Sequence, residues 1–129
     1  MTPNENPLPG AGGEPSVDFD QLRAASGDDP GFMQDLAKLY FDQANEIMPA
    51  LGAALEKRSA DDVDYLAHKL AGASLSCGMS GMVAPLRELE TRGRKGDLTG
   101  AEGFMAQAAA NLEIVRAAVQ EYLRSGKTA

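Results

Sequence analysis

Apolar residues in the stretch from Asp61 to Glu90 follow a helical repeat that constrains the fold more than any other feature of the chain. They recur three or four positions apart, which at about 100° per residue gathers them on one stripe about 80° wide. The stripe consists of Val63, Leu66, Leu70, Ala73 and Cys77. The single histidine of the sequence, His68, projects about 180° from its centre. A helix that packs by this stripe therefore presents the imidazole to solvent.

Two further helix starts precede this stretch. Asp18 as N-cap and Gln21 at the third helical position predict a short helix that runs to about Ala25. Asp29-Pro30 is a helix-start signal that opens a long helix. Its expected buried face comprises Phe32, Leu36, Leu39, Gln43 and Ile47, with Tyr40 at the margin. Pro49 interrupts the repeat, and we expect a kink or brief break there.

The histidine helix begins after an N-cap at Ser59 or Asp61 and ends near Gly78. The apolar face of the next helix consists of Met82, Leu86 and Leu89. Pro85 fits best in the first turn of that helix, and 93–96 is predicted as a turn.

The last helix is expected to run to about Arg124. Thr99 and Glu102 have the spacing of a capping box at its start. Its face comprises Met105, Ala108, Leu112, Val115, Val119 and Tyr122. We therefore predict an all-α protein, an antiparallel four-helix bundle with a short N-terminal helix over residues 16–125. Residues 1–15, rich in Pro and Gly, and 126–129 are expected to be tails.

Composition excludes several classes of function. A net charge of -7 argues against nucleic acid and anionic membranes as partners, because both favour a basic surface. No apolar run approaches the roughly 20 residues that span a bilayer, and the first residues do not resemble a signal peptide, so we expect a cytoplasmic protein. Cys77 lies on the buried stripe and is interpreted as a core residue. With one histidine and one cysteine, no metal site is expected.

The surface around His68 is unusually bare. Its helical neighbours are Asp64, Tyr65, Ala71 and Gly72, followed on the same face by Leu75 and Met79. Side chains lean toward the helix N-terminus, so a glycine at position 72 opens space above the ring. Glycine within a helix costs about 1 kcal/mol relative to alanine, which suggests that access to the imidazole matters.

An exposed imidazole is substantially neutral near pH 7, and its free ring nitrogen is a nucleophile that needs no base. Attack on an acyl phosphate would form a phosphoimidazole that passes the group onward. A single histidine therefore suffices if a partner supplies the metal ion and the acidic pocket.

One run of residues carries a recognisable motif: His68, Leu70, Gly72, Ser74, Gly78, Met82, Leu86, Leu89 and Glu90. With this run, and with Asp28-Asp29, Phe41 and Asp61-Asp62 in the usual layout, the chain resembles histidine-containing phosphotransfer (HPt) domains over roughly Val17 to Arg124. The family pattern reads approximately H-x-L-K-G-S/A-S/A, followed by a glycine ten residues after the histidine and a later L-E pair.

The resemblance implies that His68 is the phosphoacceptor and that Gly72 provides clearance. The implied partners are the receiver domains of a hybrid histidine kinase and of a response regulator. The protein itself would need no cofactor, since Mg²⁺ belongs to the partner receiver domain. Many relatives carry a phosphate-steadying lysine three residues after the histidine, where this chain has Ala71. Lys69 is the first candidate to replace it, ahead of Arg87 and Arg94.

Several neighbours of His68 have two interpretations. Asp64 either orients the ring or favours the helix dipole. Leu75 and Met79 form a docking patch or contact a neighbouring helix. Tyr65 flanks the docking surface or packs at the edge of the bundle, and Ser74 packs, bonds back to its own helix or contacts phosphate.

The hypothesis is a monomeric phosphocarrier without ATP-dependent kinase activity, because the sequence has no glycine-rich phosphate loop. The alternative is a helical adaptor that binds signalling partners through the same face without phosphate chemistry.

Overall fold

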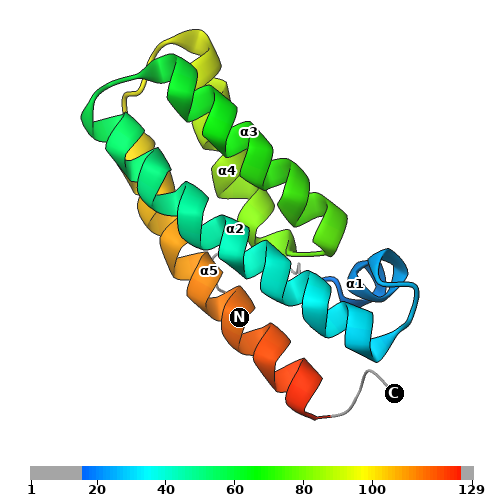
Figure 1. The fold of residues 1–129 in the computed structure, drawn as a ribbon. Helices are drawn as coiled ribbons and strands as arrows, with labels where there is room; N and C mark the ends of the chain where they lie inside the picture. Colours follow the sequence, from blue (N-terminus) through cyan, green and yellow to red (C-terminus); the bar gives the residue numbers. More distant parts are fainter. Residues whose placement is uncertain (1–15, 126–129) are drawn as a thin grey trace, which may run out of the picture.

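The computed structural model describes residues 16–125, and every regular element in this range is a helix (Figure 1). The helices are α1 (Phe19–Ala25), α2 (Pro30–Glu56), α3 (Ala60–Cys77), α4 (Ser80–Lys95) and α5 (Ala101–Arg124). The four long helices run antiparallel to their neighbours around one core, in the ring order α2, α3, α4, α5. Helix α1 lies across one end, against α2 and α3. The predicted all-helical bundle with a short first helix is confirmed, whereas the predicted tails, 1–15 and 126–129, lie outside the described residues.

Helix α1 begins as its sequence predicts, and it docks against the end of α3. The N-cap Asp18 accepts a hydrogen bond from the Gln21 backbone N–H at 3.1 Å. The backbone N–H of Asp18 also donates to the carbonyl of Gly78 at 2.7 Å, at the end of α3. Gly78 has a φ of +79°, and a Cβ there would collide with the Asp18 carbonyl oxygen. Glycine at this position thus both ends α3 and lets α1 approach it.

The predicted buried face of α2 was wrong in the first half of the helix, which is rotated relative to the prediction, whereas Ile47 is buried as expected. Tyr40, expected at the margin, is fully buried, whereas Phe32 and Leu39 are largely exposed. The actual core face consists of Met33, Ala37, Tyr40, Phe41, Ala44, Ile47, Met48, Leu51, Ala54 and Leu55. Helix α2 packs against both α3 and α5, so its buried surface is wider than the predicted stripe and includes the small residues Ala37 and Ala44.

Both prolines lie inside continuous helices. Helix α2 continues through the exposed Pro49, so of the expected kink or brief break the break does not occur. The carbonyl that loses its helical partner belongs to the exposed residue Asn45, which water can reach. Pro85 lies inside α4 rather than in its first turn, and the Gly81 carbonyl that it leaves free accepts a bond at 2.6 Å from the buried amide of Asn111 on α5.

The predicted turn at 93–96 and the capping box that follows were also wrong. Helix α4 continues to Lys95 and ends at Gly96, whose φ is +74°. The N-cap of α5 is Gly100, while Thr99 accepts a bond from Arg92 through its carbonyl and Glu102 pairs with Arg58 of the loop between α2 and α3. The predicted N-cap of α3 is confirmed at Ser59, although its side chain makes no cap bond and its hydroxyl donates to Asp62 instead.

Helix α3 buries a wider stripe than the sequence predicted. Val63, Leu70 and Cys77 are buried as expected, but Leu66 and Ala73 are half-buried. The buried set instead extends through Ala67, Ala71 and Ser74. On a helical wheel this change turns the face by about 50° toward α4. His68 still lies outside the core.

Gly93 allows α4 to approach α3 beside the histidine. A Cβ at this position would lie 2.5 Å from the backbone nitrogen of Asp64 and 2.7 Å from the carbonyl oxygen of Ala60. These are backbone atoms of the first turns of α3, so they have no side-chain rotamer with which to relieve the contact. The close approach of the two helices therefore depends on glycine.

We predict that Gly93→Ala destabilises the fold by about 1–3 kcal/mol, because the added methyl group must push α4 away from α3. Urea denaturation of both proteins measures the difference. Gly72→Ala is the matched control, since a Cβ at Gly72 meets nothing within 4 Å. The control should be stabilised by up to about 1 kcal/mol through helix propensity. Equal stabilities of the Gly93→Ala and wild-type proteins would contradict the close-packing argument.

Within residues 16–125, none of the helices is long and apolar enough to cross a membrane. The described residues also contain no cluster of three or more His, Cys, Asp or Glu side chains that could hold a metal ion.

Candidate functional site

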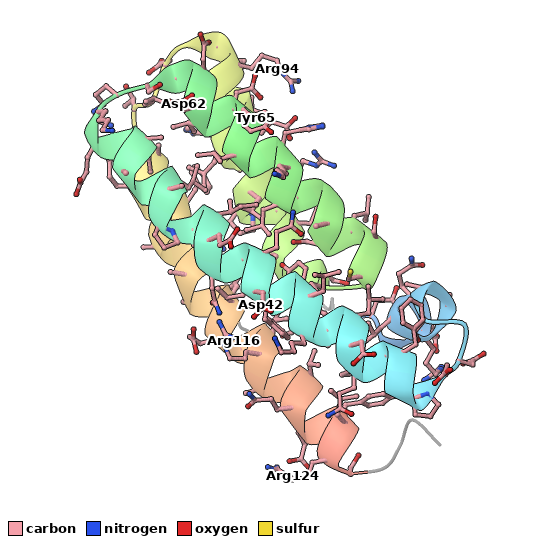
Figure 2. All side chains as sticks on the ribbon, viewed as in Figure 1. Asp42, Asp62, Tyr65, Arg94, Arg116 and Arg124 are labelled. Carbon is pink, nitrogen blue, oxygen red and sulfur yellow. The ribbon has the colours of Figure 1, made fainter. Side chains whose placement is uncertain are left out.

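His68 lies midway along α3, and its side chain is 65% exposed. The predicted exposure of the imidazole is confirmed. The ring lies on the α4 side of α3, where it meets side chains from the second half of α4. Figure 2 places Tyr65 of α3 and Arg94 of α4 in the same region of the bundle.

The exposed ring is held by a buried carboxylate. His68 Nδ1 lies 2.7 Å from Oε2 of Glu90, whose side chain is only 6% exposed. An acidic side chain at so buried a position needs hydrogen-bonding partners. Glu90 is on α4, and its neighbour Leu89 is buried in the core, which directs the carboxylate toward the α3–α4 seam.

Two arginines complete the shell of Glu90. Arg87 Nη1 lies 2.7 Å from Glu90 Oε1, and Arg94 Nη2 lies 2.6 Å from Oε2. They stand three residues before and four residues after Glu90, so all three side chains share one face of α4. Arg94 also approaches Asp64 of α3 at 3.5 Å. The carboxylate thus has three donors, of which the His68 ring joins it to α3 and the two arginines belong to its own helix.

These contacts keep Glu90 ionised. Burial raises the pKa of the Glu90 carboxyl, but hydrogen bonds from Arg87 and His68 and the charges of both groups outweigh burial and leave the pKa below its ordinary value. An ionised carboxylate can only accept hydrogen bonds. We therefore assign the ring proton of neutral His68 to Nδ1, which leaves Nε2 with its lone pair unprotonated on the exposed side.

The bare surface predicted beside His68 is present on one side of the ring. A Cβ built on Gly72 has no atom within 4 Å, so nothing in the fold itself requires glycine there. Tyr65 and Leu75 are exposed, as a docking surface needs.

Two residues expected on this surface are buried instead. Ala71 is fully buried, because the rotated face of α3 turns it toward α4. Met79 is also fully buried, since α3 ends at Cys77 and the chain reverses at Gly78 before Met79 becomes the N-cap of α4. The prediction that both residues are exposed was wrong, and Met79 belongs to the core.

The remaining candidates have other partners. Asp64 approaches Arg94, and the ring of His68 is held by Glu90 instead. The Lys69 ammonium lies 5.9 Å from the centre of the Tyr65 ring. The hydroxyl of Ser74 donates to the carbonyl of Leu70 at 2.7 Å, which confirms the back-bond to its own helix.

Ser74 also helps to fix the position of α2 along the axis of α3. Its hydroxyl proton is used on Leu70, so Tyr40 must donate the 2.6 Å bond between the two hydroxyls. This bond places the exposed Leu39 of α2 at the level of Leu75 of α3.

The contacts of Phe41 give the direction of Leu39. Phe41 lies under Arg116 of α5, and residues 39 and 41 project about 100° to either side of Tyr40. Leu39 therefore faces away from α5, on the α3 side of α2.

The sequence interpretation assigned no site role to Glu90, although the L-E pair was part of the pattern. Glu90 follows the buried Leu89 in α4 and is flanked by Arg87 and Arg94 at helical spacing. An acidic residue with basic neighbours on both sides was the available signal. What the sequence does not contain is the pairing of position 90 with position 68 across two helices.

Comparison with known proteins identifies the family. The sequence profile of the Hpt domain matches residues 35–122. The chain belongs to the Hpt domain family. Hpt domains are phosphocarriers that relay phosphate with receiver domains, and this protein is accordingly an Hpt domain phosphotransfer protein. No curated protein sequence matches the chain.

A solved structure has the same fold. The crystal structure of histidine-containing phosphotransfer protein B (HptB) from Pseudomonas aeruginosa PAO1 superimposes with a TM-score of 0.80. The match covers 86% of this chain and 96% of that one, at 23% sequence identity. At this identity the likeness concerns the fold, the Hpt-like helical bundle.

We predict that Glu90→Gln lowers the free energy of unfolding at pH 7 by about 1–3 kcal/mol, because two arginines lose their buried counter-ion. Because the pKa of Glu90 is lowered in the folded protein, the ionised carboxylate contributes its full stabilisation of the fold above the ordinary glutamate pKa of about 4.3. The stabilisation disappears as the pH falls through the lower folded-state pKa.

Urea denaturation from pH 7 to pH 3 should therefore show the stabilities of the wild-type and Glu90→Gln proteins converge in acid. The exposed Glu88, which pairs with Arg92 on the same helix, provides the control Glu88→Gln, with an expected change below about 1 kcal/mol. A stability difference between Glu90→Gln and wild type that does not shrink in acid would contradict this account.

Proposed function

We propose that this protein carries a phosphoryl group on His68 between the receiver domains of a hybrid histidine kinase and a response regulator. The observation that carries the proposal is the bond from His68 Nδ1 to a buried, ionised carboxylate, with the rest of the ring exposed. This arrangement supports a nucleophile at Nε2, fixed in tautomer and orientation and open to a macromolecular partner.

The transfer needs one displacement at phosphorus. The lone pair of His68 Nε2 forms the N–P bond as the P–O bond of the partner's aspartyl phosphate breaks, and the electron pair of that bond leaves with the aspartate carboxylate. The proton on Nδ1 stays in place, so the phosphorylated ring carries a positive charge. The Glu90 carboxylate faces that charge and stabilises it. The reverse displacement delivers the group to a second receiver aspartate.

The docking surface that we propose surrounds His68 along α3 and extends to α2. It includes Tyr65 and Leu75 of α3 and Leu39 of α2, all three of them exposed. Gly72 belongs to the same surface as the position that must stay clear, with Asp64 at its α4 edge. Apolar contacts of this kind let an acidic protein bind an acidic receiver domain, whose own site supplies Mg²⁺. We propose that the domain, residues 16–125, acts as a monomer.

Transfer to His68 is tested by incubation with a phosphorylated receiver domain, followed by detection of an acid-labile, base-stable phosphate. We expect wild type to acquire the label and His68→Ala to lose it entirely, because the chain has no other histidine. Equal labelling of both proteins, or of neither, would contradict the proposal. Stable binding of the receiver domain without any label would instead support a helical adaptor.

Gly72→Gln tests the clearance at the site. The side chain at position 72 leans toward His68, so glutamine should slow transfer from a receiver domain about tenfold or more while leaving the fold intact. The same substitution should raise stability slightly, since glycine is the poorer helix former. Rapid-quench kinetics and urea denaturation give the two quantities.

Gly103→Gln in α5 is the matched control, because a Cβ there also meets nothing within 4 Å. It should leave the transfer rate unchanged. Unchanged transfer in Gly72→Gln as well would remove the clearance argument.

A further inference from the structure

Arg94 is the cation most closely tied to the histidine ring. Its Nη2 and the Nδ1 of His68 bond the same oxygen, Oε2 of Glu90, at 2.6 and 2.7 Å. The guanidinium and the imidazole therefore lie side by side at the α3–α4 seam. We propose that Arg94 binds the phosphoryl group on His68 and so replaces the lysine that the chain lacks at Ala71. This inference rests on the proposed phosphocarrier function.

The guanidinium of Arg94 has N–H donors available for a phosphoryl group. Arginine carries five N–H donors in a planar fork that suits phosphate oxygens. The bonds found for Arg94 use Nη2, which contacts Glu90 and, at a longer 3.5 Å, Asp64. The side chain is 63% exposed. A phosphoryl dianion is a stronger acceptor than a carboxylate at 3.5 Å, so phosphorylation favours a shift of Arg94 from Asp64 toward the new group.

The other cations near His68 are less well placed. Arg87 bonds Oε1 of Glu90, the oxygen that does not contact the ring, and it is less exposed, at 41%. Lys69 projects about 100° away from His68 around α3, and its ammonium lies over Tyr65.

Five charged groups lie near His68 on the two helices that flank the ring. Asp64 and Lys69 belong to α3, whereas Arg87, Glu90 and Arg94 belong to α4. Among the three cations of this set, Arg94 alone shares the hydrogen-bonded oxygen of the histidine ring.

Phosphoramidate allows a test without a protein partner. His68 Nε2 forms an N–P bond as the P–N bond of phosphoramidate breaks, and ammonia leaves with the electron pair. The ³¹P resonance of the phosphorylated protein is then titrated with pH. A nearby cation favours the phosphoryl dianion and lowers the pKa of the phosphoryl group.

Arg94→Ala should therefore raise the pKa of the phosphoryl group by about 0.5, the size expected of an exposed ion pair. The increase should diminish in 1 M salt, where charges are screened. Arg94→Lys should retain most of the wild-type value. Arg87→Ala and Lys69→Ala are the matched controls, with less than half the shift of Arg94→Ala.

A second measurement distinguishes a role of Arg94 in binding the phosphoryl group from a role in holding Glu90 against the His68 ring. The ¹⁵N resonances of the unphosphorylated His68 ring report its tautomer, and Arg94→Ala should keep the proton on Nδ1. Loss of this tautomer in Arg94→Ala, an unchanged phosphoryl pKa, or a larger shift in Lys69→Ala would each overturn the role of Arg94. Failure of phosphoramidate to label His68 in wild type would instead overturn the phosphocarrier function, and the inference with it.

Discussion

The carboxylate of Glu90 is the interaction on which the site depends. It is buried at the seam of α3 and α4 and accepts bonds from the ring of His68 and from two arginines. A buried charge without partners would be strongly destabilising, so these donors and the acceptor require one another. The same contacts lower the pKa of Glu90, which keeps it an acceptor at neutral pH. Glu90 thus has a structural and a chemical role: the bond that joins the two helices also fixes Nδ1 as the protonated nitrogen of the neutral His68 ring.

The backbone makes this bond possible through a close approach of helices. Gly93 stands one turn after Glu90, and its missing side chain lets α4 lie against the backbone of α3 at Ala60 and Asp64. Small residues on α3, Ala67 and Ala71, continue the close packing on the other side of the seam. Further along α3, the hydroxyl bond between Tyr40 and Ser74 sets the level of α2, and burial raises the pKa of Tyr40 to about 12, so the phenol stays neutral.

Sequence patterns within single helices predicted much of the fold, whereas they did not predict most contacts between helices. Caps at Asp18 and Asp29, the end of α3 at Gly78 and the exposure of His68 depend on residues within one or two turns of each other, and all were predicted. The face of α2 was wrong because two neighbouring helices share its burial. Ala71 and Met79 were misplaced since helix rotation and a chain reversal decide their burial. Pro85 fits inside α4 because a distant amide, Asn111, serves the freed carbonyl.

The packing of α3 against α4 beside His68 accounts for the departure from the family pattern at Ala71. A lysine on the histidine helix places its charge three residues from the ring, and in this chain that position faces α4 and is buried as Ala71. Burying a lysine there would demand a partner or a shifted pKa. Helix α4 instead brings two arginines to the same seam, where Glu90 holds them beside the ring. Arginine offers five N–H donors against the three of lysine, so the proposed role of Arg94 would place phosphate-binding charge on the neighbouring helix while α3 and α4 remain closely packed.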